Sequence, residues 1–203
     1  MTEKFLDRAY GTNAPDTVRD FYDDWAASYD AEVAENGYVT PRRVAAALAS
    51  YVRADAPLLD YGCGTGLSGL ALRAAGFTVV DGLDPSGEML TIARQKNIYR
   101  DLGRVDLDAP APIPADTYDA IACIGVISTG AAPPDTLHMV MTALRKGGHL
   151  GLSFNDHALA DPAYEAALCQ WLDTGAACLL FKEYGDHLPG QDLKSNVYIV
   201  EKM

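Results

Sequence analysis

The part of the chain whose residue types and spacing best suit chemistry is a glycine-rich loop at 60–66, DYGCGTG, which follows an apolar run and precedes a helical pattern. Glycine has no Cβ, so the backbone of such a loop can turn sharply and approach a ligand closely. The N–H groups of the helical turn that follows have no partners within the helix and can donate to that ligand. We therefore expect a nucleotide-type ligand in contact with Asp60, Gly62, Cys63, Gly64, Gly66 and Leu67.

Two classes of ligand bind loops of this kind, and the residues favour one of them. A dinucleotide places its pyrophosphate on the helix N-terminus through the pattern G-x-G-x-x-G. A match begins at Gly64, but it starts two residues into the loop, and the third glycine position counted from the strand end is Leu67. Residues 56–72 contain no Lys or Arg to meet a phosphate, whereas Asp60 could meet the ammonium of S-adenosylmethionine. The loop favours S-adenosylmethionine, and NAD stays open as the alternative.

Acidic residues at the ends of the next two expected strands extend this site. Asp84 lies 18 residues after Gly66, where both ligand classes place an acid that accepts hydrogen bonds from ribose hydroxyls; the alternative role is a helix cap. Asp106, at the end of the third expected strand, could accept from the adenine amino group or be a solvated acid. Met89 could cover the adenine or belong to the core. We expect the adenosine end to contact Asp84, Pro85, Met89, Asp106, Leu107 and Ile124.

An alternation of strands and helices after residue 57 must position these residues. Before it, a helix is expected over 17–35, because its apolar residues recur at spacings of three and four. Thr40 followed by Pro41 is typical of a helix start, with Thr40 as the N-cap. The expected strands are 58–61, 77–83, 104–107, 118–124, 149–154, 177–185 and 196–202, and the later helices begin near 67, 86, 137 and 161.

This order predicts an α/β fold with a Rossmann-like, seven-stranded mixed sheet and helices on both faces. The sheet is parallel except for one antiparallel strand of a C-terminal edge hairpin, since no helix separates the last two strands. A chain of 203 residues is long enough for one well-cored domain. We divide it into an N-terminal helical cap (1–53), a cofactor-binding core (57–155) and a C-terminal helix and hairpin (156–203).

The composition limits the classes of partner that the chain could bind. The chain has 28 Asp and Glu against 16 Lys and Arg, and its formal net charge is −12. A chain this acidic repels phosphate backbones and anionic lipids, so we expect neither nucleic acid nor membrane as a partner. The four cysteines form no CxxC pair, the histidines lack metal-ligand spacing, and the start has no apolar signal-peptide core. We expect a cytoplasmic protein without a metal.

Five segments together resemble the class I S-adenosylmethionine-dependent methyltransferases. They are DYGCGTG (60–66), GLDPSGEML (82–90), VDL (105–107), YDAIACIG (118–125) and LRKGGHL (144–150), in the order and spacing of that family. The resemblance covers about half of the chain, and it implies a methyltransferase fold with S-adenosylmethionine as the cofactor. One departure is Lys146, where the family usually has proline before the glycine turn; it concerns only that turn.

Two N-terminal segments, YDDWAASYD (22–30) and YVTPR (38–42), are similar to the group of the Williams–Beuren syndrome chromosome region methyltransferase-like protein and its bacterial relatives. In that group the N-terminal helix lies over the cofactor. The resemblance therefore implies that Tyr22, Trp25 and Tyr29 contact the cofactor or substrate. The alternative is an amphipathic stripe that packs on the sheet, and for Trp25 we favour the core. The chain lacks the Asn/Asp-Pro-Pro-Tyr element of amino-methylating DNA enzymes after the fourth strand, which also argues against a nucleic-acid substrate.

The predicted reaction is an in-line methyl transfer to a small molecule, in which positioning supplies most of the catalysis. The catalytic residue stays unknown, and His157 is the best-placed base. The alternative is that His157 is an exposed loop histidine without a catalytic role, as lone loop histidines usually are. Other groups at this edge of the sheet are Ser128, Thr129, Asn155 and Asp156. A protein that binds S-adenosylmethionine or S-adenosylhomocysteine without turnover is a further alternative, and the chain is expected to be a monomer or a homodimer.

Overall fold

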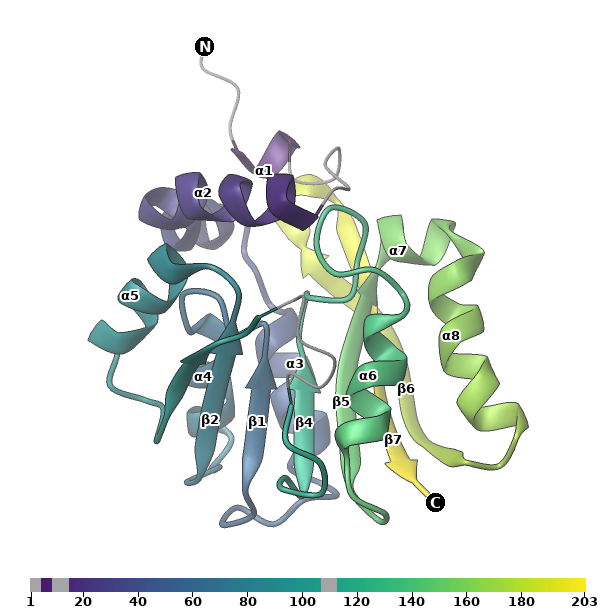
Figure 1. The fold of residues 1–203 in the computed structure, drawn as a ribbon. Helices are drawn as coiled ribbons and strands as arrows, with labels where there is room; N and C mark the ends of the chain where they lie inside the picture. Colours follow the sequence, from purple (N-terminus) through teal and green to yellow (C-terminus); the bar gives the residue numbers. More distant parts are fainter. Residues whose placement is uncertain (1–4, 9–14, 107–112) are drawn as a thin grey trace.

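The computed structural model describes residues 5–8, 15–106 and 113–203, and it places a sheet between two layers of helices (Figure 1). One face of the sheet is covered by α3 (Thr40–Leu48) and α4 (Leu67–Ala74), and the other by α6 (Thr136–Ala143) and α8 (Pro162–Asp173). The helix α5 (Gly87–Gln95) packs beside β2 and β3, and the short α7 (Asp156–Ala160) follows β5. Helix α2 (Pro15–Glu35) lies with α1 (Phe5–Arg8) across the carboxyl ends of the parallel strands (Figure 1).

The sheet has seven strands in the order β3-β2-β1-β4-β5-β7-β6. The first five of these pair in parallel, and β7 is antiparallel to both of its neighbours. The expected seven-stranded mixed sheet with a C-terminal hairpin is therefore confirmed, with β7 second from the edge and β6 outside it. The strands are β1 (Leu58–Tyr61), β2 (Val80–Asp84), β3 (Leu102–Arg104), β4 (Ala120–Cys123), β5 (His149–Asn155), β6 (Ala177–Leu188) and β7 (Leu193–Lys202), and η2 (Pro189–Gln191) joins the last two.

Buried strands explain why the central sequence runs are apolar without alternation. All residues of β1 and β4 are buried. Successive side chains point to opposite faces, so Leu58 joins the core under α3 and α4 while Leu59 joins the core under α6 and α8. The third strand ends at Arg104, earlier than expected, because β2 ends at its partner Asp84 and leaves nothing further to pair with.

The chain order creates a crevice at one place in the sheet. From β1 the chain moves outward to β2 and β3, and it then returns to β4 on the other side of β1. Ligands of open α/β sheets bind beyond the carboxyl ends of the strands at such a reversal. The crevice therefore lies above β1 and β4, where α2 crosses the sheet (Figure 1).

The start of α3 differs from the prediction. Val39 occupies the N-cap without a side-chain hydrogen bond, and Thr40 is the first helical residue. The Thr40 hydroxyl turns inward, where its Oγ1 lies 2.8 Å from Nδ1 of His187 and 3.0 Å from Oγ of Ser195. Because α3 packs on the β6–β7 hairpin, the Thr40 hydroxyl contacts buried side chains of that hairpin and does not cap the helix. None of the described helices has the length and apolar character needed to cross a membrane.

Candidate functional site

A cavity of about 660 Å³ lies at the carboxyl ends of the parallel strands, and we call it the main cavity. Its walls come from α2, the loops after β1 and β4, the end of β2 and the start of α6. This volume is within the range of small-molecule sites. The sequence-predicted residues that line it are Tyr22, Tyr29, Gly62, Cys63, Gly64, Leu67, Asp84, Pro85, Met89 and Ile124.

The glycine loop has a backbone conformation and a close packing that favour glycine over residues with side chains. Gly62 and Gly64 have φ angles of 73° and 52°, in the left-handed region that glycine adopts readily. A Cβ on Gly62 would lie 2.3 Å from Cγ2 of Val126, so this position has no room for a side chain. A Cβ on Gly64 would meet nothing within 4 Å, because Gly64 faces the open cavity. The loop thus presents bare backbone to whatever fills the cavity.

Asp84 holds this loop and lines the cavity. Its Oδ2 accepts a hydrogen bond from the Gly64 N–H at 2.8 Å, and its Oδ1 accepts from the Ser86 N–H at 2.9 Å. Burial raises the pKa of Asp84 to about 6, and the carboxylate of Asp23 adds to the rise. The two carboxylate oxygens keep further lone pairs, so Asp84 can accept from ligand hydroxyls while it fixes the loop.

Asp60 lies behind the loop and does not line the main cavity, contrary to the direct ammonium contact expected from the sequence. Its carboxylate is fully buried, and Oδ2 accepts from Ser68 Oγ at 2.6 Å and from Tyr99 Oη at 2.7 Å. Its Oδ1 has no hydrogen-bond partner in the described part of the chain. Burial raises the pKa of Asp60 to about 6, and the nearby Asp84 carboxylate adds to it. Asp60 therefore supports the loop through α4.

Helix α2 is fastened over the main cavity by two aspartates that lie two helical turns apart. Asp30 accepts from Thr65 Oγ1 in the glycine loop at 2.5 Å and from Lys96 Nζ at 2.7 Å. Asp23 accepts from Ser86 Oγ, just after β2, at 2.5 Å. The two contacts join α2 to both segments that carry the loop and Asp84, so the helix covers one side of the cavity.

The aromatic residues of α2 divide between the cavity and the core. Tyr22 and Tyr29 line the main cavity. Trp25 does not line it; the indole is buried against Phe21 and Leu6, which confirms its assignment to the core. Its ring lies 4.7 Å from that of Tyr29, edge to face. Trp25 therefore sets the position of Tyr29 at the cavity wall.

Residues 33–194 match a family model described as a methyltransferase domain. The chain belongs to this methyltransferase family. The sequence resemblance to class I S-adenosylmethionine-dependent methyltransferases is thereby confirmed.

A sequence relative agrees with the family, and two solved structures agree with the fold. Methyltransferase-like protein 27 of Homo sapiens is 38% identical over 117 residues, which are 56% of this chain and 48% of that protein, so the chain spans about half the length of this curated relative. A methyltransferase of Haloferax volcanii, solved in complex with the activator Trm112, has a TM-score of 0.66 at 19% identity and covers 91% of this chain and 97% of its own. A methyltransferase of Thiobacillus denitrificans in complex with S-adenosylhomocysteine has a TM-score of 0.54 at 13% identity, over 79% and 91%.

Besides Asp60, three described residues of the predicted site, Gly66, Asp106 and His157, do not line the main cavity. Asp106 lies beyond the end of β3 on the surface, and Leu107 falls outside the described residues. Gly66 is the N-cap of α4 and faces Tyr99. His157 is exposed on α7 and lines no described cavity, because β5 ends at Asn155 and the chain turns outward there. A role for His157 as a base has no support from this geometry.

Several residues of the site were missed by the sequence reasoning. Asp23 and Asp30 sit seven residues apart in a motif that was assessed only for its aromatic residues. Tyr99 was missed because its pocket is made by absent side chains: a Cβ on Gly69 would lie 2.3 Å from Tyr99 Oη, and one on Gly82 3.1 Å from Tyr99 Cδ1. Glycines inside a helix and a strand were the available signal for this close approach. No group of three or more His, Cys, Asp or Glu within the described ranges could hold a metal ion.

Proposed function

We propose that the chain binds S-adenosylmethionine in the main cavity and catalyses methyl transfer to a small-molecule acceptor. The observation that carries the proposal is the Asp84 carboxylate, which lies against the Gly64 N–H at the edge of an open cavity. When bound, S-adenosylmethionine supplies a methyl group on a positively charged sulfur. Family membership supports this chemistry.

The residues of the cavity fit the parts of this cofactor. Asp84 is suited to accept from the ribose hydroxyls, with Pro85 and Met89 in the wall beside it. The backbone of the glycine loop, with Tyr22 and Tyr29 opposite, suits the aminoacyl end. Asp60 acts as a positioning residue in this proposal, because Ser68 and Tyr99 lie around it.

The charge of the cavity wall suits a cationic cofactor better than a dinucleotide. Among the described lining residues the basic side chain is Arg19, which is paired with Asp20, while Asp84, Asp135 and Asp161 are acidic. A pyrophosphate in this wall would face carboxylates, whereas a sulfonium is attracted to them and to the aromatic rings of α2. These charges support the methyltransferase over the oxidoreductase alternative.

A small acceptor is favoured by the limited volume of the site. Asp23 and Asp30 hold α2 across the cavity, which leaves about 660 Å³ for the cofactor and the acceptor together. The net charge of −12 opposes a nucleic-acid acceptor. Methyl transfer needs alignment and exclusion of water more than a dedicated base.

Isothermal titration calorimetry with S-adenosylhomocysteine, S-adenosylmethionine and NAD tests the proposal. We expect the two sulfur nucleosides to bind and NAD not to bind. Asp84→Asn should weaken S-adenosylhomocysteine binding by about 1–3 kcal/mol, because one oxygen acceptor becomes a donor. The matched control is Asp173→Asn, an exposed aspartate at the end of α8, which should bind as the unmodified chain does. Tighter binding of NAD would refute the proposal.

A screen with isotopically labelled S-adenosylmethionine and a panel of small amines, phenols, thiols and carboxylic acids then tests turnover. Transfer of label to one of these classes is the expected outcome. Cofactor binding with no transfer to any class would favour the alternative of a protein that binds the cofactor without turnover.

A further inference from the structure

A second, smaller hollow of about 40 Å³ adjoins the main cavity on the side of β4 and β5, and we call it the inner recess. It is lined by Trp25 and Tyr29 of α2, Tyr38, Ser128 after β4, Asn155 at the end of β5 and His187 of β6. Tyr29, Tyr38 and Ser128 line both hollows. A water occupies about 10–15 Å³ on this measure, so the recess holds a few waters or one small functional group. The glycine loop follows β1 and Asp84 ends β2, and neither lines the recess, which leaves the recess to the acceptor.

Asn155 presents its amide nitrogen as a donor. Its Oδ1 accepts from the backbone N–H of Ala158 at 3.0 Å and from Ser128 Oγ at 3.1 Å. The backbone N–H can only donate, so this contact fixes which end of the amide is oxygen. The amide nitrogen donates to none of the described residues, and Asn155 is buried in the recess wall. Its two N–H groups are therefore available to a group in the recess.

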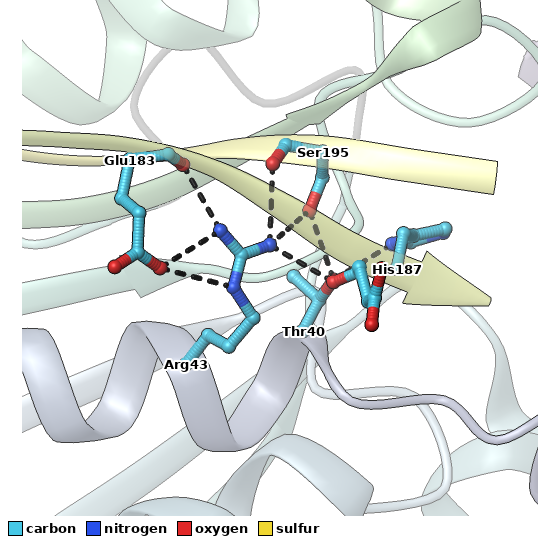
Figure 2. A network of polar contacts seen from close by, with 6 residues as sticks. Thr40, Arg43, Glu183, His187 and Ser195 are labelled. Carbon is cyan, nitrogen blue, oxygen red and sulfur yellow. Dashed lines mark hydrogen bonds and ion pairs between the residues drawn. The ribbon is translucent and has the colours of Figure 1, made fainter. Parts of the chain in front are cut away.

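His187 is fixed as a donor by a chain of contacts that begins at Arg43, as Figure 2 shows. Arg43 Nη1 can only donate, and it lies 3.0 Å from Ser195 Oγ. Ser195 Oγ lies 3.0 Å from Thr40 Oγ1, which lies 2.8 Å from Nδ1 of His187. Each hydroxyl proton finds an acceptor when Ser195 donates to Thr40 and Thr40 donates to Nδ1. The ring proton then sits on Nε2, the nitrogen left for the recess.

The charge state of His187 agrees with this assignment. Burial lowers the pKa of His187 to about 4; the Asp156 carboxylate acts in the opposite direction, and the positive charge of Arg43 opposes protonation as well. The ring is held edge to face by Tyr38, with 5.2 Å between the centroids. At neutral pH the recess is therefore faced by a neutral imidazole with a fixed N–H.

Trp25 adds an unsatisfied donor to the same wall. Its Nε1 is buried and has no hydrogen-bond partner in the described part of the chain. A buried N–H without an acceptor is costly, and such a group in a native structure calls for an explanation. The recess is thus lined by three residues that carry N–H donors, Trp25, Asn155 and His187, and by no charged side chain among the described residues.

We propose that the inner recess is the acceptor-binding subsite of the methyltransferase and that it takes a neutral carbonyl oxygen, as in an amide, ketone or ester, on Asn155 and His187. The proposal rests on the proposed function for the cofactor cavity next to it. Neutral donors suit an oxygen acceptor, and the absence of a cation from the described wall disfavours a buried carboxylate. The net charge of −12 disfavours an anion further.

The test is a titration of ¹⁵N-labelled protein, saturated with S-adenosylhomocysteine, with acetamide and separately with acetate. The chain has two tryptophans, so its spectrum contains two indole N–H signals that can report on binding. The Trp171 indole donates to Nδ1 of His138 at 2.8 Å, away from both cavities, and serves as the internal control. We expect acetamide to shift the Trp25 indole signal saturably and to leave the Trp171 signal in place. Acetate should bind at least about tenfold more weakly.

The matched variant is Asn155→Asp, because aspartate keeps the cap acceptor for Ala158 and the acceptor for Ser128, while a carboxylate oxygen replaces the amide donor. Acetamide binding should weaken about tenfold or more, with S-adenosylhomocysteine affinity unchanged. Full acetamide binding in the variant, or tighter acetate binding by the unmodified chain, overturns the proposal. Absence of any acetamide shift while calorimetry shows S-adenosylhomocysteine bound overturns the subsite alone. Absence of S-adenosylhomocysteine binding overturns the proposed function instead.

Discussion

Replacement of Asp60 by asparagine should change how the stability of the protein depends on pH. The carboxyl group of Asp60 is fully buried, and burial raises its pKa in the folded protein to about 6 from the ordinary value of 3.8. A raised folded pKa means that the folded state binds the proton more tightly than the unfolded state does. Ionisation of Asp60 therefore costs stability as the pH rises from about 4 to about 6, and the cost is complete above that window.

The size of the effect follows from the shift. About two pKa units correspond to about 3 kcal/mol over the whole window. Titration from pH 5 to pH 8 captures about 1 kcal/mol of it and avoids the region near the isoelectric point, where the chain loses its net charge. In Asp60→Asn this loss is absent, so the free energy of unfolding of the variant relative to the unmodified chain should rise by about 1 kcal/mol between pH 5 and pH 8.

The assay is urea unfolding followed by tryptophan fluorescence at several pH values in this range. Comparison of differences between pH values cancels any constant cost of the new amide, whose N–H₂ replaces an oxygen that has no partner among the described residues. The exposed Asp173→Asn variant is the control and should run parallel to the unmodified chain. Parallel curves for Asp60→Asn as well would refute the reasoning that Asp60 ionises at a burial cost.

Three further predictions concern the glycine loop, the packing of Tyr99 behind it, and helix α2. S-adenosylhomocysteine affinity should be constant above about pH 7 and fall toward pH 5, because burial raises the pKa of Asp84 to about 6 and only the carboxylate accepts two ribose hydroxyls; calorimetry over this range measures it, and a flat profile would contradict it. Gly69→Ala should destabilise the fold by about 1–3 kcal/mol in chemical unfolding, since its Cβ would meet Tyr99 Oη at 2.3 Å, whereas Gly87→Ala, with nothing within 4 Å, should be neutral or slightly stabilising. Asp30→Asn should speed amide hydrogen exchange in α2, because Lys96 loses its charged partner; unchanged exchange would mean that this contact does not hold the helix.

The fold could be predicted because its signals are local. The uninterrupted apolar runs of β1 and β4, the glycine loop and the Ser86 cap, which accepts from the Met89 N–H at 3.0 Å, each depend on neighbouring residues. The end of β3 could not be predicted, because it depends on where its partner β2 ends. Local patterns fix the elements, whereas pairing across the sheet fixes their limits.

The cavity wall was predicted where the backbone determines the position, as at Gly62, Gly64 and Asp84. The prediction for Asp60 missed its surroundings, because Ser68 and Tyr99 approach from α4 and from the segment after α5. The role of Thr40 was also missed, since its partner His187 is 147 residues away in the sequence. Contacts at such separations follow from packing, and one sequence contains no direct record of them.

Helix α2 contributes to the inner recess as well as to the main cavity, and this shared wall gives a last prediction. Trp25 and Tyr29 complete the recess only while α2 is docked, and α2 docks through Asp30 on Thr65 of the glycine loop. A ligand that rests on this loop and on Tyr29 stabilises the docked helix and thereby the recess. Thermodynamic linkage requires that S-adenosylhomocysteine raise acetamide affinity by the same factor by which acetamide raises S-adenosylhomocysteine affinity. Acetamide titrations with and without S-adenosylhomocysteine measure this factor, and Asp30→Asn should reduce it. Equal acetamide affinities in the two titrations would mean that the recess is formed independently of the loop.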